Sequence, residues 1–212
     1  MGDLPYEHQI CWETFRDDQI ALLDHLDIKE DCHVVGSCIG PSYALQLLRD
    51  YPERFQKAVL LQPIGLGQYT TEMESEKWIG LNTDATQHWF GDWADEMQRT
   101  GRVTIEGSTS PNPLDNNVSD TFLPPPLERL YQSMFGNERS DFCFSVTRND
   151  VSKIQNPLLV FPGIDFRHPA ITAREITELA PNAKIIEEWR RNPNLSKRLQ
   201  YAAEKIEQFL LY

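Results

Sequence analysis

Apolar residues along the chain alternate between helical spacing and short continuous runs. Helical spacing over 12–26, with acidic residues on the opposite side, predicts an amphipathic helix. A polar turn and the apolar run "HVVGSC" (33–38) follow, which predicts a short buried strand. A second helix is predicted over 41–51, where Pro52 ends it, and a second apolar run covers 57–65. Two apolar runs on either side of a helix predict a parallel βαβ unit.

The pattern changes over 66–150 and then returns. This stretch combines short helical segments rich in large aromatic residues with a loop rich in Gly, Ser, Pro and Asn, which predicts a helical insertion. The alternation of strands and helices resumes with a predicted strand over 157–165 and a predicted helix over 169–179. A predicted strand over 184–189 and a predicted terminal helix over 195–211 follow.

The length and composition fit one domain with an insertion. The chain has 212 residues, of which 40% are hydrophobic and 25% charged, as in ordinary globular proteins. We therefore predict the α/β class with a mostly parallel sheet. Residues 1–65 and 151–212 form the core of this prediction, and residues 66–150 form a helical cap inserted into it.

Charge and cysteine usage narrow the range of partners and cofactors. A formal charge of −12 disfavours nucleic acid and anionic membranes as partners. No stretch has the pattern of a signal peptide or the length of a membrane span, so we expect a cytoplasmic protein. The cysteines show neither a C-x-x-C pair nor metal-ligand spacing, which predicts reduced thiols, no metal and no cofactor. They are Cys11, Cys32, Cys38 and Cys143.

The stretch "GSCIG" (36–40) joins the first predicted strand to the following helix. A turn of the form Gly-x-nucleophile-x-Gly holds its central residue in a strained conformation, and the glycines let strand and helix approach each other. Gly36 and Gly40 match this spacing around Cys38. The helix N-terminus would favour a Cys38 thiolate, and the N–H of Ile39 would donate to an oxyanion. The alternative is that Cys38 is a small buried residue that fits the end of a strand.

Two longer stretches resemble the second half of an α/β-hydrolase-fold protein. They are "CHVVGSCIGPSYALQLLRDYPERFQKAVLLQPIG" and "NPLLVFPGIDFRHPAITAREITELAPNAKIIEEW". The insertion at 66–150 matches the position of the cap in that family. The resemblance implies that Cys38 occupies the nucleophile position, as in the subset that resembles dienelactone hydrolases. It also implies that Asp165, at the end of a predicted strand, occupies a usual position of the catalytic acid.

One departure from the family concerns the base. In that family a histidine follows the last strand, but no histidine follows His168 in this chain. An imidazole is the usual agent that activates the nucleophile and protonates the leaving group. Two interpretations of His168 stay open, since it either substitutes as the base or holds the start of a helix. Asp165 likewise either orients a base or caps that helix.

A second departure concerns the strands that precede the nucleophile in the family. We expect these N-terminal strands to be missing here, because the chain begins just before the helix that leads to the 33–38 strand. That strand would then have one bare edge, which invites pairing with another chain. We therefore predict a homodimer through this edge, or a chain that is poorly soluble alone.

The sequence leaves two classes of function open. The first is a hydrolase of a small-molecule ester, thioester or lactone with Cys38 as nucleophile, or an acyltransferase that passes the acyl group to an alcohol or amine. The second is a non-catalytic binding or interaction module, or an inactive descendant of such an enzyme. The turn at Cys38 favours the first class, and the missing histidine favours the second. We expect the cap and its loops to determine which substrate is bound.

Overall fold

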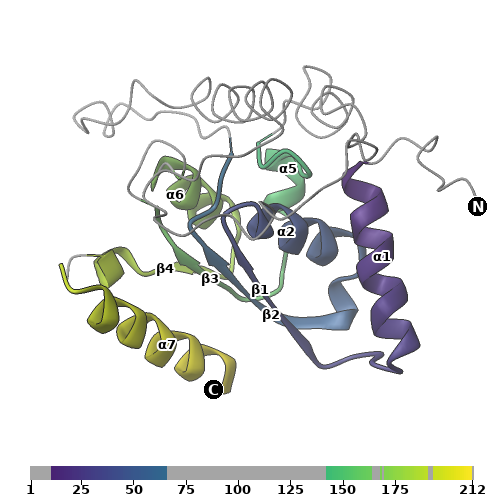
Figure 1. Cartoon of the computed structure of the whole chain (residues 1–212). Coiled ribbons are helices and arrows are strands. Elements are labelled where there is room, and N and C mark those ends of the chain that lie inside the picture. The colour runs from purple at the N-terminus through teal and green to yellow at the C-terminus, as the bar shows by residue number, and fades with distance from the viewer. Residues whose placement is uncertain (1–10, 66–141, 164–167, 169, 191–192, 212) are drawn as a thin grey trace, which may run out of the picture.

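A four-stranded parallel sheet lies at the centre of the molecule (Figure 1). The computed structural model describes residues 11–65, 142–163, 168, 170–190 and 193–211. In spatial order the strands are β1 (Cys32–Ser37), β2 (Phe55–Leu61), β3 (Leu158–Phe161) and β4 (Ala183–Ile185). The predicted α/β class with a parallel sheet is confirmed, including the first βαβ unit.

Helices cover both faces of this sheet. The helices are α1 (Trp12–His25), α2 (Gly40–Asp50), α5 (Arg148–Val151), α6 (Ala170–Leu179) and α7 (Leu195–Leu211), with 3-10 turns η1 (Pro52–Arg54) and η6 (Glu187–Arg190). Buried residues of α2, α5 and α6 share one core with the strands, whereas α7 shares a second core on strands β2 and β3. The predicted helical ranges agree with α1, α2, α6 and α7 to within one residue at each end.

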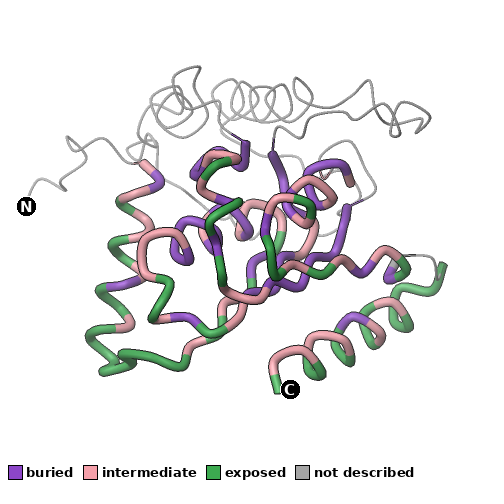
Figure 2. The backbone as a smooth tube through the Cα atoms, turned by 180° about the vertical axis from the view of Figure 1, so that it is seen from behind, coloured by how far each residue is buried: buried purple, intermediate pink, exposed green. Residues whose placement is uncertain are grey.

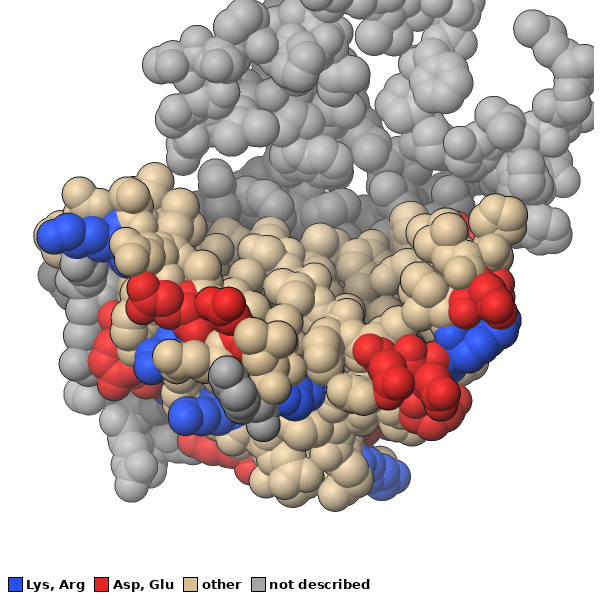
Figure 3. All heavy atoms as spheres, turned by 90° about the horizontal axis from the view of Figure 1, so that it is seen from below, with Lys and Arg blue, Asp and Glu red and all other residues tan. Residues whose placement is uncertain are grey.

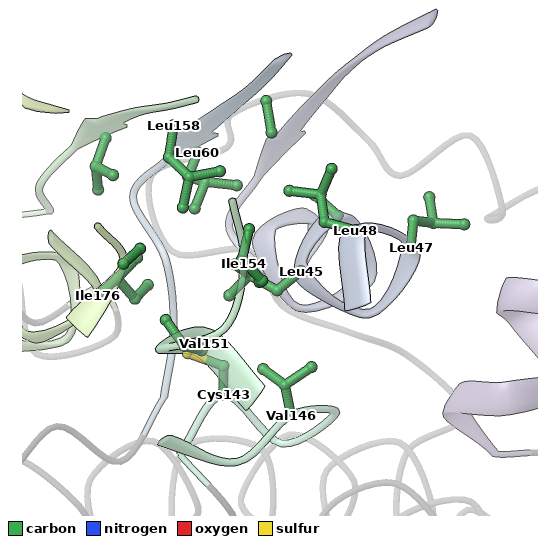
Figure 4. Close-up of a cluster of buried hydrophobic side chains, with 14 of the residues drawn as sticks. Leu45, Leu47, Leu48, Leu60, Cys143, Val146, Val151, Ile154, Leu158 and Ile176 are labelled. Atoms are coloured by element: carbon green, nitrogen blue, oxygen red, sulfur yellow. The ribbon is translucent and has the colours of Figure 1, made fainter. Parts of the chain in front are cut away.

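The larger core lies between the sheet and helices α2, α5 and α6. Its side chains converge from segments far apart in the sequence, as the close-up of Leu45, Leu60, Leu158 and Ile176 shows (Figure 4). Each of these four side chains is fully buried or nearly so. Complete burial of a Leu or Ile side chain stabilises the fold by roughly 1.5–3 kcal/mol, so this core holds α2 and α6 against the strands.

Residues 142–150 belong to this core, although the sequence analysis assigned them to the insertion. Phe142, Cys143 and Val146 are buried in the larger core, and Phe144 is buried in a smaller one beside Cys38. The Ser145 hydroxyl donates to the Ser42 carbonyl at 2.6 Å, which ties this segment to α2. Residues 66–141 of the predicted cap lie outside the described residues.

The last strand is shorter than predicted. The sequence predicts a strand over 184–189, but β4 ends at Ile185 and the chain turns into η6. The turn brings the Trp189 indole back to the end of β3, where its N–H donates to the Pro162 carbonyl at 2.9 Å. The same ring packs edge-on against Phe161. This contact between distant residues cannot be read from local periodicity.

Strand β1 forms an edge of the described sheet and is only partly buried. Among the described strands it pairs with β2 alone, and only Gly36 of its six residues is buried. The predicted burial of this strand is therefore wrong, because the core shared with α7 lies on β2 and β3 and leaves Val35 of β1 exposed. Figure 2 shows buried residues concentrated in the interior and exposed residues along the outer faces of α1 and α7. The predicted homodimer through this edge is not tested by the fold.

None of the helices in the described ranges has both the length and the apolar character needed to cross a bilayer.

Candidate active site

Cys38 lies in the tight turn between β1 and α2. Its φ angle is 62°, in the left-handed region that residues with a side chain rarely adopt. Such a conformation costs about 1–3 kcal/mol, and it persists only where surrounding contacts impose it. Here the Cys38 N–H donates to the Leu61 carbonyl at 3.0 Å, and the Cys38 carbonyl accepts from the Ile64 N–H at 3.3 Å. The end of β2 therefore holds the turn, and the Cys38 residue is left half-buried.

The two glycines of the turn meet different surroundings. A Cβ atom on Gly36 would lie 2.4 Å from the Gly40 carbonyl carbon and 2.7 Å from the Pro41 nitrogen, so only glycine fits there. A Cβ atom on Gly40 would meet nothing within 4 Å. The expectation that both glycines permit the close approach is therefore correct for Gly36 and wrong for Gly40. The reason is that the helix begins at Gly40 and directs that position away from the strand.

Ile39 follows Cys38 and is the N-cap residue of α2. Its backbone N–H donates to no residue in the described part of the chain, whereas its carbonyl accepts from the Ser42 N–H at 3.0 Å. An N–H group at the first turn of a helix is suited to an anion, because the helix dipole adds to the hydrogen bond. This arrangement is compatible with the predicted oxyanion role of Ile39, which stays a prediction.

An apolar cluster lies against one side of the turn. It consists of Trp12, Ile64 and Phe144, with Phe15, Cys38, Ile39 and Tyr43 packed against it. The ring centroids of Trp12 and Tyr43 are 4.9 Å apart. Burial raises the pKa of Tyr43 to about 12, because the apolar surroundings disfavour the charged phenolate. The sequence analysis did not find Tyr43, and the signal it missed is the aromatic pair Trp12 and Phe15 at helical spacing in α1.

The structure describes the predicted base but not the predicted acid. Asp165 lies outside the described residues. His168 is half-buried and lies against the end of β3, since a Cβ atom on Gly163 would clash with the His168 carbonyl. In sheet order β3 is two positions from β1, or about 10 Å at the usual strand spacing. A general base must come within about 2.6–3.2 Å of its proton donor, so the role of His168 stays a prediction.

Gln62 is a residue that the sequence analysis missed. Leu61 pairs with Ser37 across the two strands, so the next residues, Gln62 and Cys38, lie side by side at the carboxyl ends of β2 and β1. Gln62 also has a left-handed φ angle, of 51°. The available signal was a polar residue before proline directly after an apolar strand. Its side-chain amide can both donate and accept hydrogen bonds.

The described residues were also compared with the ligand sets that hold metal ions. Among the described residues, no three His, Cys, Asp or Glu side chains are grouped so that they could hold a metal ion. The four cysteines are free thiols. The chemistry that the described turn itself offers is that of a thiol beside the N-terminus of an eleven-residue helix.

Comparison with known proteins gives structural neighbours only. No protein-family model matches the chain, and no curated protein matches its sequence. The protein BpoC from Mycobacterium tuberculosis H37Rv superposes with a TM-score of 0.54 and 18% identity, over 95% of this chain and 75% of BpoC. Est816, described as an N-acyl homoserine lactone degrading enzyme, gives 0.51 and 18% over 91% and 74%. MGS-M2, an α/β-hydrolase enzyme from a deep-sea metagenome library, gives 0.51 and 15% over 91% and 71%.

Some of the neighbouring structures are considerably longer than this chain. It spans 61% of a serine hydrolase from a Cycloclasticus bacterium and 65% of the meta-cleavage product hydrolase CumD from Pseudomonas fluorescens. At identities below 25%, the likenesses to BpoC, Est816 and MGS-M2 show a shared fold. Together with the parallel sheet of the described residues, they confirm the α/β-hydrolase fold expected from the sequence.

Proposed function

We propose that this chain, which has the α/β-hydrolase fold, is a hydrolase of small-molecule esters, thioesters or lactones with Cys38 as its nucleophile. The observation that carries the proposal is the left-handed Cys38 in a turn where Gly36 alone fits against the following helix. A strained residue at the carboxyl end of a strand is typical of a functional position, because such strain costs free energy and persists where the surrounding fold imposes it. Solved structures with this fold include enzymes described as hydrolases and as a lactone degrading enzyme.

The proposed reaction has two steps. In the first, the Cys38 sulfur attacks the acyl carbonyl carbon, a thioester forms, and the alcohol or thiol leaves with the proton of the Cys38 thiol. In the second, water attacks the thioester, the carboxylic acid leaves, and the sulfur regains a proton. The Ile39 N–H and the N-terminus of α2 are the groups proposed to stabilise the oxyanion in both steps.

Proton transfer needs a base and a group that orients it. His168 is proposed as the group that accepts and returns the proton, and Asp165 as the group that orients it. Because His168 belongs to the end of β3 and Cys38 to the end of β1, the imidazole must reach across β2 to act. The backbone of Gln62 lies between them at the end of β2, so its amide is proposed to contact the bound acyl group.

A second function is favoured by one observation. No histidine follows His168 in the sequence, so the usual base of this fold is missing from its usual place. A non-catalytic module that binds an acyl compound at the same turn would need no base. The experiment below separates the two functions, because only the enzyme releases product.

Steady-state hydrolysis of p-nitrophenyl esters tests the enzyme proposal. Replacement Cys38→Ala should lower kcat/KM by about 10³-fold or more, because removal of a nucleophile removes the covalent step. The matched control is Cys32→Ala, which removes another half-buried free thiol at the start of β1 and should leave the rate unchanged. Circular dichroism checks that both variants fold. Equal activity in Cys38→Ala and in the unmodified chain would exclude Cys38 as the nucleophile.

A further inference from the structure

Three strained residues lie around the Cys38 turn. Among the described residues, five that are not glycine have a left-handed φ angle. Two of them are Asp27 and Asp31 in the connection between α1 and β1, and aspartate adopts this conformation more readily than bulky residues do. The other three are Cys38, Gln62 and Phe144, with φ angles of 62°, 51° and 61°. For a residue as bulky as phenylalanine this conformation is rare, so the surroundings of Phe144 must impose it.

Among the described residues on the face that Figure 3 shows, charge does not indicate a binding site. Lys and Arg side chains lie beside Asp and Glu side chains there. Ion pairs such as Arg54 with Asp24 at 3.0 Å and Arg174 with Glu187 at 2.9 Å pair opposite charges in the described structure. A surface with both signs interspersed favours no ligand of a single charge. The strained residues around Cys38 are a clearer indication of function, because strain costs free energy.

Phe144 packs in the apolar cluster beside the Cys38 turn. It is 3% exposed and shares this cluster with Trp12 and Ile64, and Cys38 packs against the cluster. Ile64 also donates its backbone N–H to the Cys38 carbonyl at 3.3 Å. Phe142, two residues earlier, is buried as well, but it belongs to the larger core. Of these two phenylalanines, Phe144 is therefore the one that contributes to the surroundings of Cys38.

Two hydrogen bonds of Ser145 fasten the backbone next to Phe144. The Ser145 hydroxyl donates to the Ser42 carbonyl at 2.6 Å, and the Ser145 carbonyl accepts from Arg49 at 3.0 Å. Ser42 and Arg49 lie on the same side of α2, because seven residues make about two helical turns. The segment that carries Phe144 is thus attached to the helix that begins directly after the Cys38 turn. Such contacts offset a strain of about 1–3 kcal/mol at Phe144.

We propose that Phe144 is a positioning residue, which keeps the Cys38 turn in its strained geometry by packing in the cluster of Trp12 and Ile64. Loss of the ring would leave a cavity in this cluster, and Ile64 would support the Cys38 carbonyl less firmly. The turn would then relax, and the sulfur would leave the orientation in which it can attack. The effect of Phe144 on turnover rests on the proposed function, whereas its effect on the turn does not.

Hydrogen exchange of backbone amides in the full chain tests the effect on the turn. The variant is Phe144→Leu, which keeps an apolar side chain but removes the ring. The matched control is Phe142→Leu, which makes the same change in the larger core. Phe144→Leu should speed exchange of the Cys38 and Ile64 amides by about tenfold relative to the amides of β3, which report global unfolding. Phe142→Leu should leave this ratio unchanged, although both variants lower the overall stability.

Hydrolysis of p-nitrophenyl acetate tests the effect on turnover. Phe144→Leu should lower kcat by about tenfold with a smaller change in KM, because a displaced nucleophile slows the chemical step more than binding. Phe142→Leu should change kcat by less than about twofold. If Phe144→Leu does not fold, Ser145→Ala takes its place, since it removes the hydroxyl that donates to Ser42. It should change both measurements in the same direction by about threefold.

The two measurements separate this proposal from the proposed function. Unchanged exchange at Cys38 and Ile64 in Phe144→Leu, or an equal change in Phe142→Leu, would overturn the positioning role. Faster exchange in Phe144→Leu without a loss of kcat would also overturn it, because the geometry of the turn would then not limit the reaction. If the unmodified chain does not hydrolyse the ester, faster exchange in Phe144→Leu alone supports the positioning role, and only the proposed function fails.

Discussion

At the scale of single residues, the turn around Cys38 depends more on Gly36 than on Gly40. Gly36 packs against the backbone of Gly40 and Pro41, whereas the Cβ position of Gly40 is open. The sequence predicted the spacing of the two glycines but could not distinguish them, because the clash depends on how the helix leaves the strand. Tyr43 and Gln62 could not be predicted for a similar reason, because their positions beside Cys38 depend on contacts between separate elements.

Alanine substitutions at the two glycines should therefore differ strongly. Gly36→Ala should lower the free energy of unfolding by about 3 kcal/mol, because the new Cβ atom would overlap backbone atoms that cannot move independently. Gly40→Ala should change it by about 0.5 kcal/mol or less, since that Cβ position is open. Urea unfolding of the two variants measures both values. Equal destabilisation would mean that the turn is not packed as described.

At the scale of elements, one ion-pair network joins α1, α2 and α5. The Asp50 carboxylate, near the end of α2, accepts from Arg49 at 2.6 Å and from Arg16 of α1 at 2.6 Å. Arg49 also donates to the Ser145 carbonyl at 3.0 Å and lies 3.8 Å from Asp150 of α5. The hydrogen bond from Arg49 lowers the pKa of Asp50 below its ordinary value of 3.8, and the hydrogen bond from Arg16 adds to this against the effect of burial.

This network predicts an acid dependence of stability. Because the folded pKa of Asp50 lies below the unfolded value, its contribution is present above pH 3.8 and is lost as the pH falls through the folded pKa. Asp50→Asn should lower the free energy of unfolding by about 1–2 kcal/mol at neutral pH, since the carboxylate is only partly exposed. The difference from the unmodified chain should shrink as the pH falls below 3.8.

Asp27→Asn is the control for this experiment, because Asp27 is 91% exposed and its carboxylate lies 3.6 Å from the exposed Lys29 ammonium group. Urea unfolding at neutral pH and at a series of lower values measures all three chains. A destabilisation of Asp50→Asn that does not change with pH would contradict the role of the Asp50 charge.

The order and type of most elements could be predicted, because each carries its own periodicity. The range of α7 agrees with the expectation at both ends, since apolar residues recur at helical spacing over 195–211. The end of β4 and the placement of residues 142–150 could not be predicted. The end of β4 depends on the hydrogen bond from Trp189 to Pro162. The placement of residues 142–150 depends on the hydrogen bond from Ser145 to Ser42. Both bonds join parts of the chain that are distant in sequence.

At the scale of the whole molecule, the sheet of the described residues places the Cys38 turn at the carboxyl ends of two paired strands. Among the described strands β1 pairs with β2, and the carboxyl end of β1 runs into the turn that holds Cys38. The Leu61 carbonyl and the Ile64 N–H hold this turn, so the geometry of the proposed nucleophile depends on the pairing of β1 with β2.

The proposed covalent step can be observed directly by mass spectrometry of the chain during turnover. The full chain is mixed with p-nitrophenyl acetate, quenched in acid within the first turnovers and digested, and the acylated peptide is identified. The account predicts an acetyl group on the peptide that contains Cys38, which appears before product accumulates and is absent in Cys38→Ala. Ester hydrolysis without this adduct, or with the acetyl group on Cys11, Cys32 or Cys143 instead, would contradict the central claim.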